Sequence, residues 1–243
     1  MNLLFDFGNT NTKIAVYKGN ILVEAETFKE LNINDIKKLE YFSSINNVIL
    51  SSVVYYKDEI KNYLKNNFNN FIELNSETQT PIELRYKNKQ YLGNDRIATA
   101  VGANNIFPNT NVLVIDFGTA ITFDLINSKN QFIGGNISPG VSLRFESLSK
   151  HTKKLPLVQK DKNFELIGSD TKSAILFGVE NGILFEVEGY INKLQKQFKP
   201  LKVILTGGDA FLFERIIKKP IFVESNLLFH GLNRILNYNV KNN

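Results

Sequence analysis

The chain has 243 residues, no cysteine, and a formal net charge of +5 from 29 Lys and Arg against 24 Asp and Glu. With 43% hydrophobic and 22% charged residues, it has the composition of a folded protein, long enough for one large domain or two smaller ones. The lack of Cys excludes disulfides, thiolate metal sites and Cys nucleophiles.

Charge and hydropathy patterning exclude further classes. The segment Met1–Asp6 has no basic stretch, so no signal peptide is expected, and no run of about 18 apolar residues could cross a membrane. We therefore expect a cytoplasmic protein without membrane contact. Only five of the basic residues are Arg and the Lys residues are scattered, so no nucleic-acid partner is expected either.

The chain contains an internal repeat. Residues 3–8 read Leu-Leu-Phe-Asp-Phe-Gly, and residues 113–118 read Leu-Val-Ile-Asp-Phe-Gly. Each copy begins a predicted three-strand meander, which continues over 12–17 and 21–28 in the first copy and over 119–126 and 131–137 in the second. The repeat favours a duplicated domain, with a chance match of a short triplet as the alternative.

The other predicted elements complete an α/β pattern. In chain order they are a strand at 47–52, helices at 57–68, 94–106 and 170–198, a strand at 202–206, and helices at 210–218 and 226–237. Glycines inside 170–198 allow a break in that helix. Strands that alternate with helices predict an α/β fold with mixed sheets, divided into halves 1–109 and 110–243.

A polar loop follows the first Asp-Phe-Gly. Gly8 lets the backbone approach a ligand closely, and Asp6 is placed to hold a metal ion on phosphates. Amide N–H groups, hydroxyls and a cation come from Asn9, Thr10, Asn11, Thr12 and Lys13. This pattern predicts a phosphate-binding hairpin, although a plain polar hairpin is the alternative. The equivalent Asp116 could face Asp6 across a cleft.

The start of the predicted helix at 94–106 carries a second candidate. Asp95 could accept a proton from a hydroxyl, and Arg96 could bind a carboxylate with two hydrogen bonds. A capping acid followed by an exposed Arg is the alternative.

Three further features of the sequence bear on its function. Residues 134–140 form a Gly-rich turn that enters a helix, and residues 206–210 lie at a strand end where nucleotides dock in α/β folds. His151 and His230 lack triad partners and are interpreted as structural or surface residues. The standard Gly-rich nucleotide motifs are absent.

Taken together, these motifs resemble type III pantothenate kinase, in order over residues 3 to 210. The matching residues are Asp6-Phe7-Gly8-Asn9-Thr10 with Lys13; Gly93-Asn94-Asp95-Arg96; Asp116-Phe117-Gly118-Thr119 with Thr122 and Asp124; residues 134–140; Thr152 with Leu155-Pro156; Gly168, Thr171 and Gly178; and Thr206-Gly207-Gly208-Asp209.

The resemblance implies a fold and an activity. The family has duplicated actin-like (ribonuclease H-like) domains with an ATP cleft between them. It transfers the γ-phosphoryl group of ATP to pantothenate, giving 4'-phosphopantothenate in the first step of coenzyme A biosynthesis.

The resemblance also implies residue roles. Asp95 would be the catalytic base. ATP would be bound by Asp6, Phe7, Gly8, Asn9, Thr10, Asn11, Thr12, Lys13 and Thr119. Pantothenate would be bound by Tyr91, Gly93, Asn94, Asp95, Arg96 and Thr171, the last across a homodimer interface. Asp116 would bind a monovalent cation, K⁺ or NH₄⁺, and Mg²⁺ would accompany ATP at Asp6.

Two positions depart from the family pattern, Lys153 where Ala is usual and Asp170 where a neutral residue is usual. Both affect the expected substrate pocket more than the expected reaction. Two other functions remain as alternatives: a non-catalytic nucleic-acid-binding regulator on an ATPase-like fold, and a kinase for a related small molecule.

Overall fold

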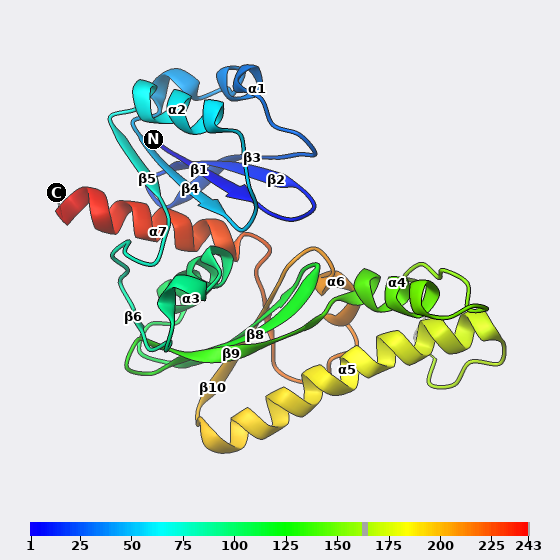
Figure 1. The fold of residues 1–243 in the computed structure, drawn as a ribbon. Helices are drawn as coiled ribbons and strands as arrows, with labels where there is room; N and C mark the ends of the chain where they lie inside the picture. The colour runs from blue at the N-terminus through cyan, green and yellow to red at the C-terminus, as the bar shows by residue number, and fades with distance from the viewer. Residues whose placement is uncertain (162–164, 243) are drawn as a thin grey trace. The chain divides into compact units, whose positions relative to one another are not determined.

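The computed structural model describes residues 1–161 and 165–242 (Figure 1). The chain forms two compact units. The first contains Met1–Pro108, Asn130–Ile133 and the chain from Asn226 onward, and the second contains Asn109–Lys129 and the described residues between Gly134 and Ser225. None of the described helices has the length and apolarity needed to cross a membrane.

The first unit is built on a five-stranded mixed sheet in the order β3-β2-β1-β4-β5. Its strands are β1 (Asn2–Phe7), β2 (Thr12–Lys18), β3 (Ile21–Phe28), β4 (Asn47–Ser52) and β5 (Asn70–Glu73). β1 runs antiparallel to β2 and parallel to β4, so its carboxyl end lies beside that of β4. All six residues of β1 are buried, as expected for a central strand covered on both faces.

The helices of this unit are α1 (Ile33–Lys37), α2 (Asp58–Asn67), α3 (Asn94–Ile106) and α7 (Leu227–Asn242), with 3₁₀ turns at Phe42–Ser44 and Lys89–Tyr91. α3 and α7 cross at Gly102 and Gly231. A β-carbon on Gly231 would lie 1.7 Å from the Ala98 carbonyl oxygen, so only glycine permits this approach. The last helix, expected in the second half of the chain, thus belongs to the first compact unit.

A row of asparagines ties α7 to this sheet. Asn70 donates to Asn47, which donates to Asn2, at 2.7 and 2.8 Å. Asn2 in turn donates to Asn233 and Asn237 of α7, at 2.8 and 2.9 Å. The three strand residues are register partners on β5, β4 and β1, which places their amides in one line.

The second sheet repeats the order of the first, with one strand, β6, added at an edge. Its order is β11-β10-β7-β8-β9-β6, with strands β6 (Glu83–Leu84), β7 (Asn111–Phe117), β8 (Ala120–Asn127), β9 (Gln131–Pro139), β10 (Leu201–Thr206) and β11 (Phe222–Val223). In each sheet the strand ending in Asp-Phe-Gly pairs antiparallel with the next strand and parallel with a later one. This shared topology confirms the predicted α/β fold with mixed sheets.

The helices of the second unit are α4 (Val141–His151), α5 (Thr171–Gln197) and α6 (Ala210–Phe213). α5 runs without a break through its glycines at 178, 182 and 189, none of which adopts a positive φ. α6 ends at Phe213, earlier than the predicted 210–218. Beyond it the chain continues in turns, in which the Ile217 N–H donates to the Phe213 carbonyl at 3.0 Å.

Candidate functional site

The first Asp-Phe-Gly ends β1 at a tight hairpin. The Gly8 N–H donates to the Asn11 carbonyl at 3.1 Å, and Asp6 is the register partner of Lys13 across the two strands. A cavity of about 220 Å³ lies over this turn. Its lining includes the loop residues Gly8, Asn9, Thr10, Asn11 and Thr12, together with Tyr55 and Lys57.

The residues of this loop differ in exposure. Asn9, Thr10 and Lys13 are exposed, whereas Thr12 is buried. The Phe7 ring is also buried and stacks on Tyr56 with 4.8 Å between ring centroids. The ring therefore belongs to the core, which leaves the loop's N–H groups and short polar side chains as its ligand-facing chemistry.

Asp6 is a buried carboxylate with unsatisfied hydrogen-bonding capacity. Its side chain is 8% exposed, and its Oδ1 accepts no hydrogen bond from the described residues. Burial and the nearby charge of Asp95 raise the pKa of Asp6 to about 7, while the Lys13 ammonium acts in the opposite direction. An orphaned carboxylate oxygen at a phosphate-type loop fits a cation ligand.

Asp95 lies in the first turn of α3, close enough to raise the pKa of Asp6 through its charge. Burial raises the pKa of Asp95, although the Arg96 backbone N–H, at 2.8 Å from Oδ1, and the Arg96 charge oppose this. A β-carbon on Gly93 would lie 2.4 Å from Asp95 Oδ1. Glycine at the N-cap therefore leaves the space that the carboxylate occupies.

Asn94 anchors the start of α3 to the sheet. Its side-chain nitrogen donates to the Ser52 carbonyl at 3.1 Å and the Leu74 carbonyl at 2.9 Å, at the ends of β4 and β5. The role of Asn94 in binding substrate, which the resemblance implies, stays a prediction. Tyr91, one turn earlier in the chain, is 77% exposed.

Arg96 is 5% exposed and lies against the rings of Tyr86 and Phe132, two residues that sequence reasoning missed. Neither belongs to a recognisable motif. Their proximity to Arg96 depends on the pairing of β6 with β9, for which a two-residue strand gives no sequence signal.

In the second unit, the segment after β10 packs tightly on the end of β7. Gly207 has φ of +93°, and a β-carbon there would lie 2.3 Å from Asp116 Oδ1 and 2.6 Å from the Phe117 backbone. The Asp209 N–H donates to the Phe117 carbonyl at 3.1 Å. Both motifs, Asp116-Phe117-Gly118 and Thr206-Gly207-Gly208-Asp209, therefore meet at adjacent strand ends, since Thr206 is the register partner of Asp116.

Thr119 is exposed at the turn after β7, and its carbonyl accepts the Gly140 N–H at 3.0 Å. A β-carbon on Gly140 would lie 2.4 Å from the Gly118 carbonyl oxygen. The Gly-rich segment at 134–140 therefore supports this turn at its last glycine, immediately before α4 begins.

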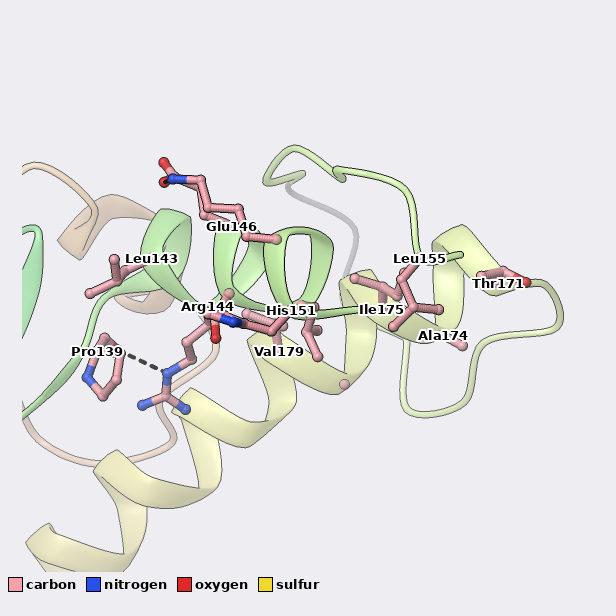
Figure 2. A pocket seen from close by; sticks show the side chains of 14 residues that line it. Pro139, Leu143, Arg144, Glu146, His151, Leu155, Thr171, Ala174, Ile175 and Val179 are labelled. Carbon is pink, nitrogen blue, oxygen red and sulfur yellow. Dashed lines mark hydrogen bonds and ion pairs between the residues drawn. The ribbon is translucent and has the colours of Figure 1, made fainter. Parts of the chain in front are cut away.

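A larger cavity of about 1020 Å³ lies between α4 and α5 (Figure 2). Its lining includes Thr171, His151 and apolar residues such as Leu143 and Ile175. Arg144 lies at one end, donating from Nε to the Pro139 carbonyl at 2.8 Å and pairing with Glu186. Thr171 is exposed at the first turn of α5, just after the Asp170 cap.

Among the described residues, no group of three or more His, Asp or Glu side chains could hold a metal ion. His230 is a hydrogen-bond partner of the Tyr17 hydroxyl at 3.0 Å, in line with its interpretation as structural. The exposed His151 lines the α4–α5 cavity.

Comparison with known proteins gives matches over most of the chain. The family model for type III pantothenate kinase matches residues 2–193. A type III pantothenate kinase from Cytophaga hutchinsonii is 43% identical over 242 residues, which cover 99% of this chain and 100% of that protein. One from Phocaeicola vulgatus is 41% identical over 241 residues, covering 99% and 100%.

Solved structures match over the same length. A Campylobacter jejuni protein assigned to the Baf family of transcriptional activators matches with a TM-score of 0.65 and 25% identity, covering 98% of this chain and 99% of that one. A glucokinase from an Antarctic psychrotroph matches with a TM-score of 0.51 and 12% identity, covering 98% of each chain. The likeness to sugar kinases shows the fold alone, and confirms the expected actin-like class.

Proposed function

Because this chain belongs to the type III pantothenate kinase family, we propose that the residues around the first hairpin and the start of α3 perform that family's reaction. The family phosphorylates pantothenate with ATP, in the first step of coenzyme A biosynthesis. The observation that carries the assignment of residues is the electrostatic proximity of two carboxylates, the buried Asp6 at the phosphate-type loop and the partly buried Asp95 at a helix start.

Asp6 and the hairpin would bind the phosphates of ATP. The main-chain N–H groups of residues 9–11 and the Lys13 ammonium would offset the phosphate charge. Asp6 Oδ1 is buried and accepts no hydrogen bond from the described residues, which supports a role in holding Mg²⁺. Proteins bind this ion through one or two carboxylates and the substrate phosphates. When bound, the metal would neutralise charge on the transferring phosphoryl group.

Asp95 would accept the proton of the pantothenate hydroxyl. A partly buried carboxylate with a raised pKa is a better base than an exposed one, and the Arg96 N–H holds Asp95 Oδ1 in the space that Gly93 leaves. Since phosphoryl transfer passes through a loose transition state, the main tasks are to orient the hydroxyl and take its proton late. Arg96 would bind the substrate carboxylate, as its planar fork of N–H donors matches that group.

Residues of the second unit would supply further contacts to ATP, the monovalent cation and pantothenate. We propose that Thr119 contacts ATP and that Asp116 binds a monovalent cation, K⁺ or NH₄⁺. The close packing of Gly207 on Asp116 supports a fixed position for that carboxylate. Thr171 would contact pantothenate across a homodimer interface, and the open α4–α5 cavity beside it supports an interface on this face. The cytoplasmic location stays a prediction.

The substitution Asp95→Asn tests this assignment. It removes the base but keeps the size and a hydrogen-bond acceptor of the side chain, so turnover of pantothenate is expected to fall about 100- to 10,000-fold. ATP binding, measured by calorimetry, is expected to persist. If most of the activity remains, Asp95 is not the base.

The two alternative functions have their own tests. A panel of hydroxyl substrates distinguishes pantothenate from the substrates of a related small-molecule kinase. Salt-sensitive binding to generic duplex DNA would favour a regulator.

A further inference from the structure

The guanidinium of Arg96 lies over two aromatic rings, those of Tyr86 and Phe132. The central carbon of its guanidinium lies 5.9 Å from the Tyr86 ring centroid and 5.8 Å from that of Phe132, while the two centroids are 6.1 Å apart. Three nearly equal distances mean that both rings lie on the same side of the guanidinium and form a corner, with 55° between their planes.

The corner is held in place by β6. Glu83 and Leu84 pair with Gln131 and Phe132 of β9, and the Arg85 N–H donates to the Phe132 carbonyl at 2.9 Å. Side-chain contacts reinforce the pairing, since Gln131 donates to Glu83 at 2.6 Å. Tyr86 is the next residue after these bonds, so its backbone is fixed at one end.

The two rings differ in burial. Phe132 is 0% exposed, whereas Tyr86 is half-buried. A cation held over aromatic faces in a partly desolvated site gains attraction from the ring quadrupoles, and the rings restrict rotation of a flexible side chain. Such a site favours one guanidinium orientation before any ligand arrives, which lowers the entropy cost of forming two parallel hydrogen bonds to a carboxylate.

We propose that Tyr86 and Phe132 are positioning residues that orient the Arg96 guanidinium, and thereby set the selectivity of the site for a substrate that carries a carboxylate. This inference rests on the role of Arg96 in the proposed function. It also gives a role to β6, a strand of only two residues, because the pairing of β6 with β9 brings the Tyr86 ring beside that of Phe132.

The test compares pantothenate with pantothenyl alcohol, in which the carboxylate is replaced by CH₂OH. Calorimetry on wild type, Tyr86→Leu and Tyr86→Phe gives the dissociation constant of each ligand. Tyr86→Leu is expected to weaken pantothenate binding about 3- to 30-fold, the range of a cation–π contact, with pantothenyl alcohol nearly unchanged. Tyr86→Phe, which keeps the ring, is expected to keep the wild-type ratio. In turnover, KM for pantothenate rises in Tyr86→Leu while kcat is nearly constant.

Equal weakening of both ligands in Tyr86→Leu, or the same loss in Tyr86→Phe, would overturn the proposal. Phe132→Leu is a second variant for the buried ring; if it fails to fold, Tyr86→Leu still carries the test. Arg96→Met tests the role of Arg96 as the carboxylate ligand separately from the role of the two rings. A wild-type ratio in Arg96→Met would remove Arg96 as the carboxylate ligand, whereas loss of the ratio there with a wild-type ratio in Tyr86→Leu would remove only the aromatic corner.

Discussion

Burial changes the acidity of three carboxyl groups in this protein. Asp6, Asp95 and Glu180 are all carboxylates whose pKa values are raised by loss of contact with water. The first two lie at the proposed active site. Glu180 lies on α5, where its Oε1 accepts the Asp161 N–H at 3.2 Å and its Oε2 accepts no hydrogen bond from the described residues.

Glu180 provides a pH-dependent stability prediction. Burial raises its pKa from 4.5 to about 7, so between these values the folded state binds more protons than the unfolded state, and the free energy of unfolding falls as the pH rises. Glu180→Gln removes this titration. The stability of the variant relative to wild type is expected to rise by about 3 kcal/mol from pH 4.5 to pH 8. Urea unfolding of both proteins at the two pH values measures this difference. If the free energies of unfolding of variant and wild type change in parallel with pH, the prediction is wrong.

Sequence reasoning found the residues that belong to motifs and missed those that depend on tertiary pairing. The hairpin at 8–12 and the helix beginning at Asn94 have local signals, namely glycines, polar turn residues and helical periodicity. Tyr86 and Phe132 lie 46 positions apart in the chain and meet through β6, so no local pattern joins them. The anchoring role of Asn94 could not be predicted either, because its partners, the Ser52 and Leu74 carbonyls, are backbone groups that every residue type carries.

At the scale of elements, the crossing of α3 and α7 fixes the helix whose first turn carries Asp95 and Arg96. Gly231 and Gly102 bring the two backbones together, and the row of asparagines ties α7 to β1. The helical pattern of 226–237 predicts the existence of α7, but not that it packs on the first unit, since the close approach depends on glycines that look like ordinary interruptions in the sequence.

Gly231→Ala tests this crossing. Its β-carbon would lie 1.7 Å from the Ala98 carbonyl oxygen, so the two helices must separate, and the free energy of unfolding is expected to fall by about 2–4 kcal/mol. Gly189→Ala is the matched control, because open space surrounds that glycine in α5; it is expected to be neutral or to stabilise by up to about 1 kcal/mol. Chemical denaturation of both variants provides the comparison. Equal effects would show that the crossing tolerates a side chain.

At the scale of the whole molecule, the two sheets share one strand order, and the repeated Asp-Phe-Gly ends the equivalent strand in each. The repeat was visible in the sequence because these short motifs lie at strand ends, where glycine and acid are required by the turn and its chemistry. A homodimer could not be predicted from the pattern of α5, because its apolar residues belong to the core of the second unit and the same pattern would suit an interface.

The proposed homodimer makes a prediction about mixed subunits. If Thr171 acts on the partner's substrate, a dimer of one Asp95→Asn chain and one Thr171→Ala chain has one intact site. Unfolding and refolding an equal mixture of two weakly active variants is expected to recover about a quarter of wild-type turnover, since half of the dimers are mixed. Activity equal to the mean of the two separate variants would contradict action across an interface.

The most direct test of the central claim is pantothenate-dependent ADP release from MgATP, measured with K⁺ and again with Na⁺ as the only monovalent cation. We predict that turnover requires pantothenate and K⁺ together, because Asp95 deprotonates its hydroxyl and Asp116 binds the monovalent cation. Folded protein that binds ATP but releases no ADP under either condition would contradict the account.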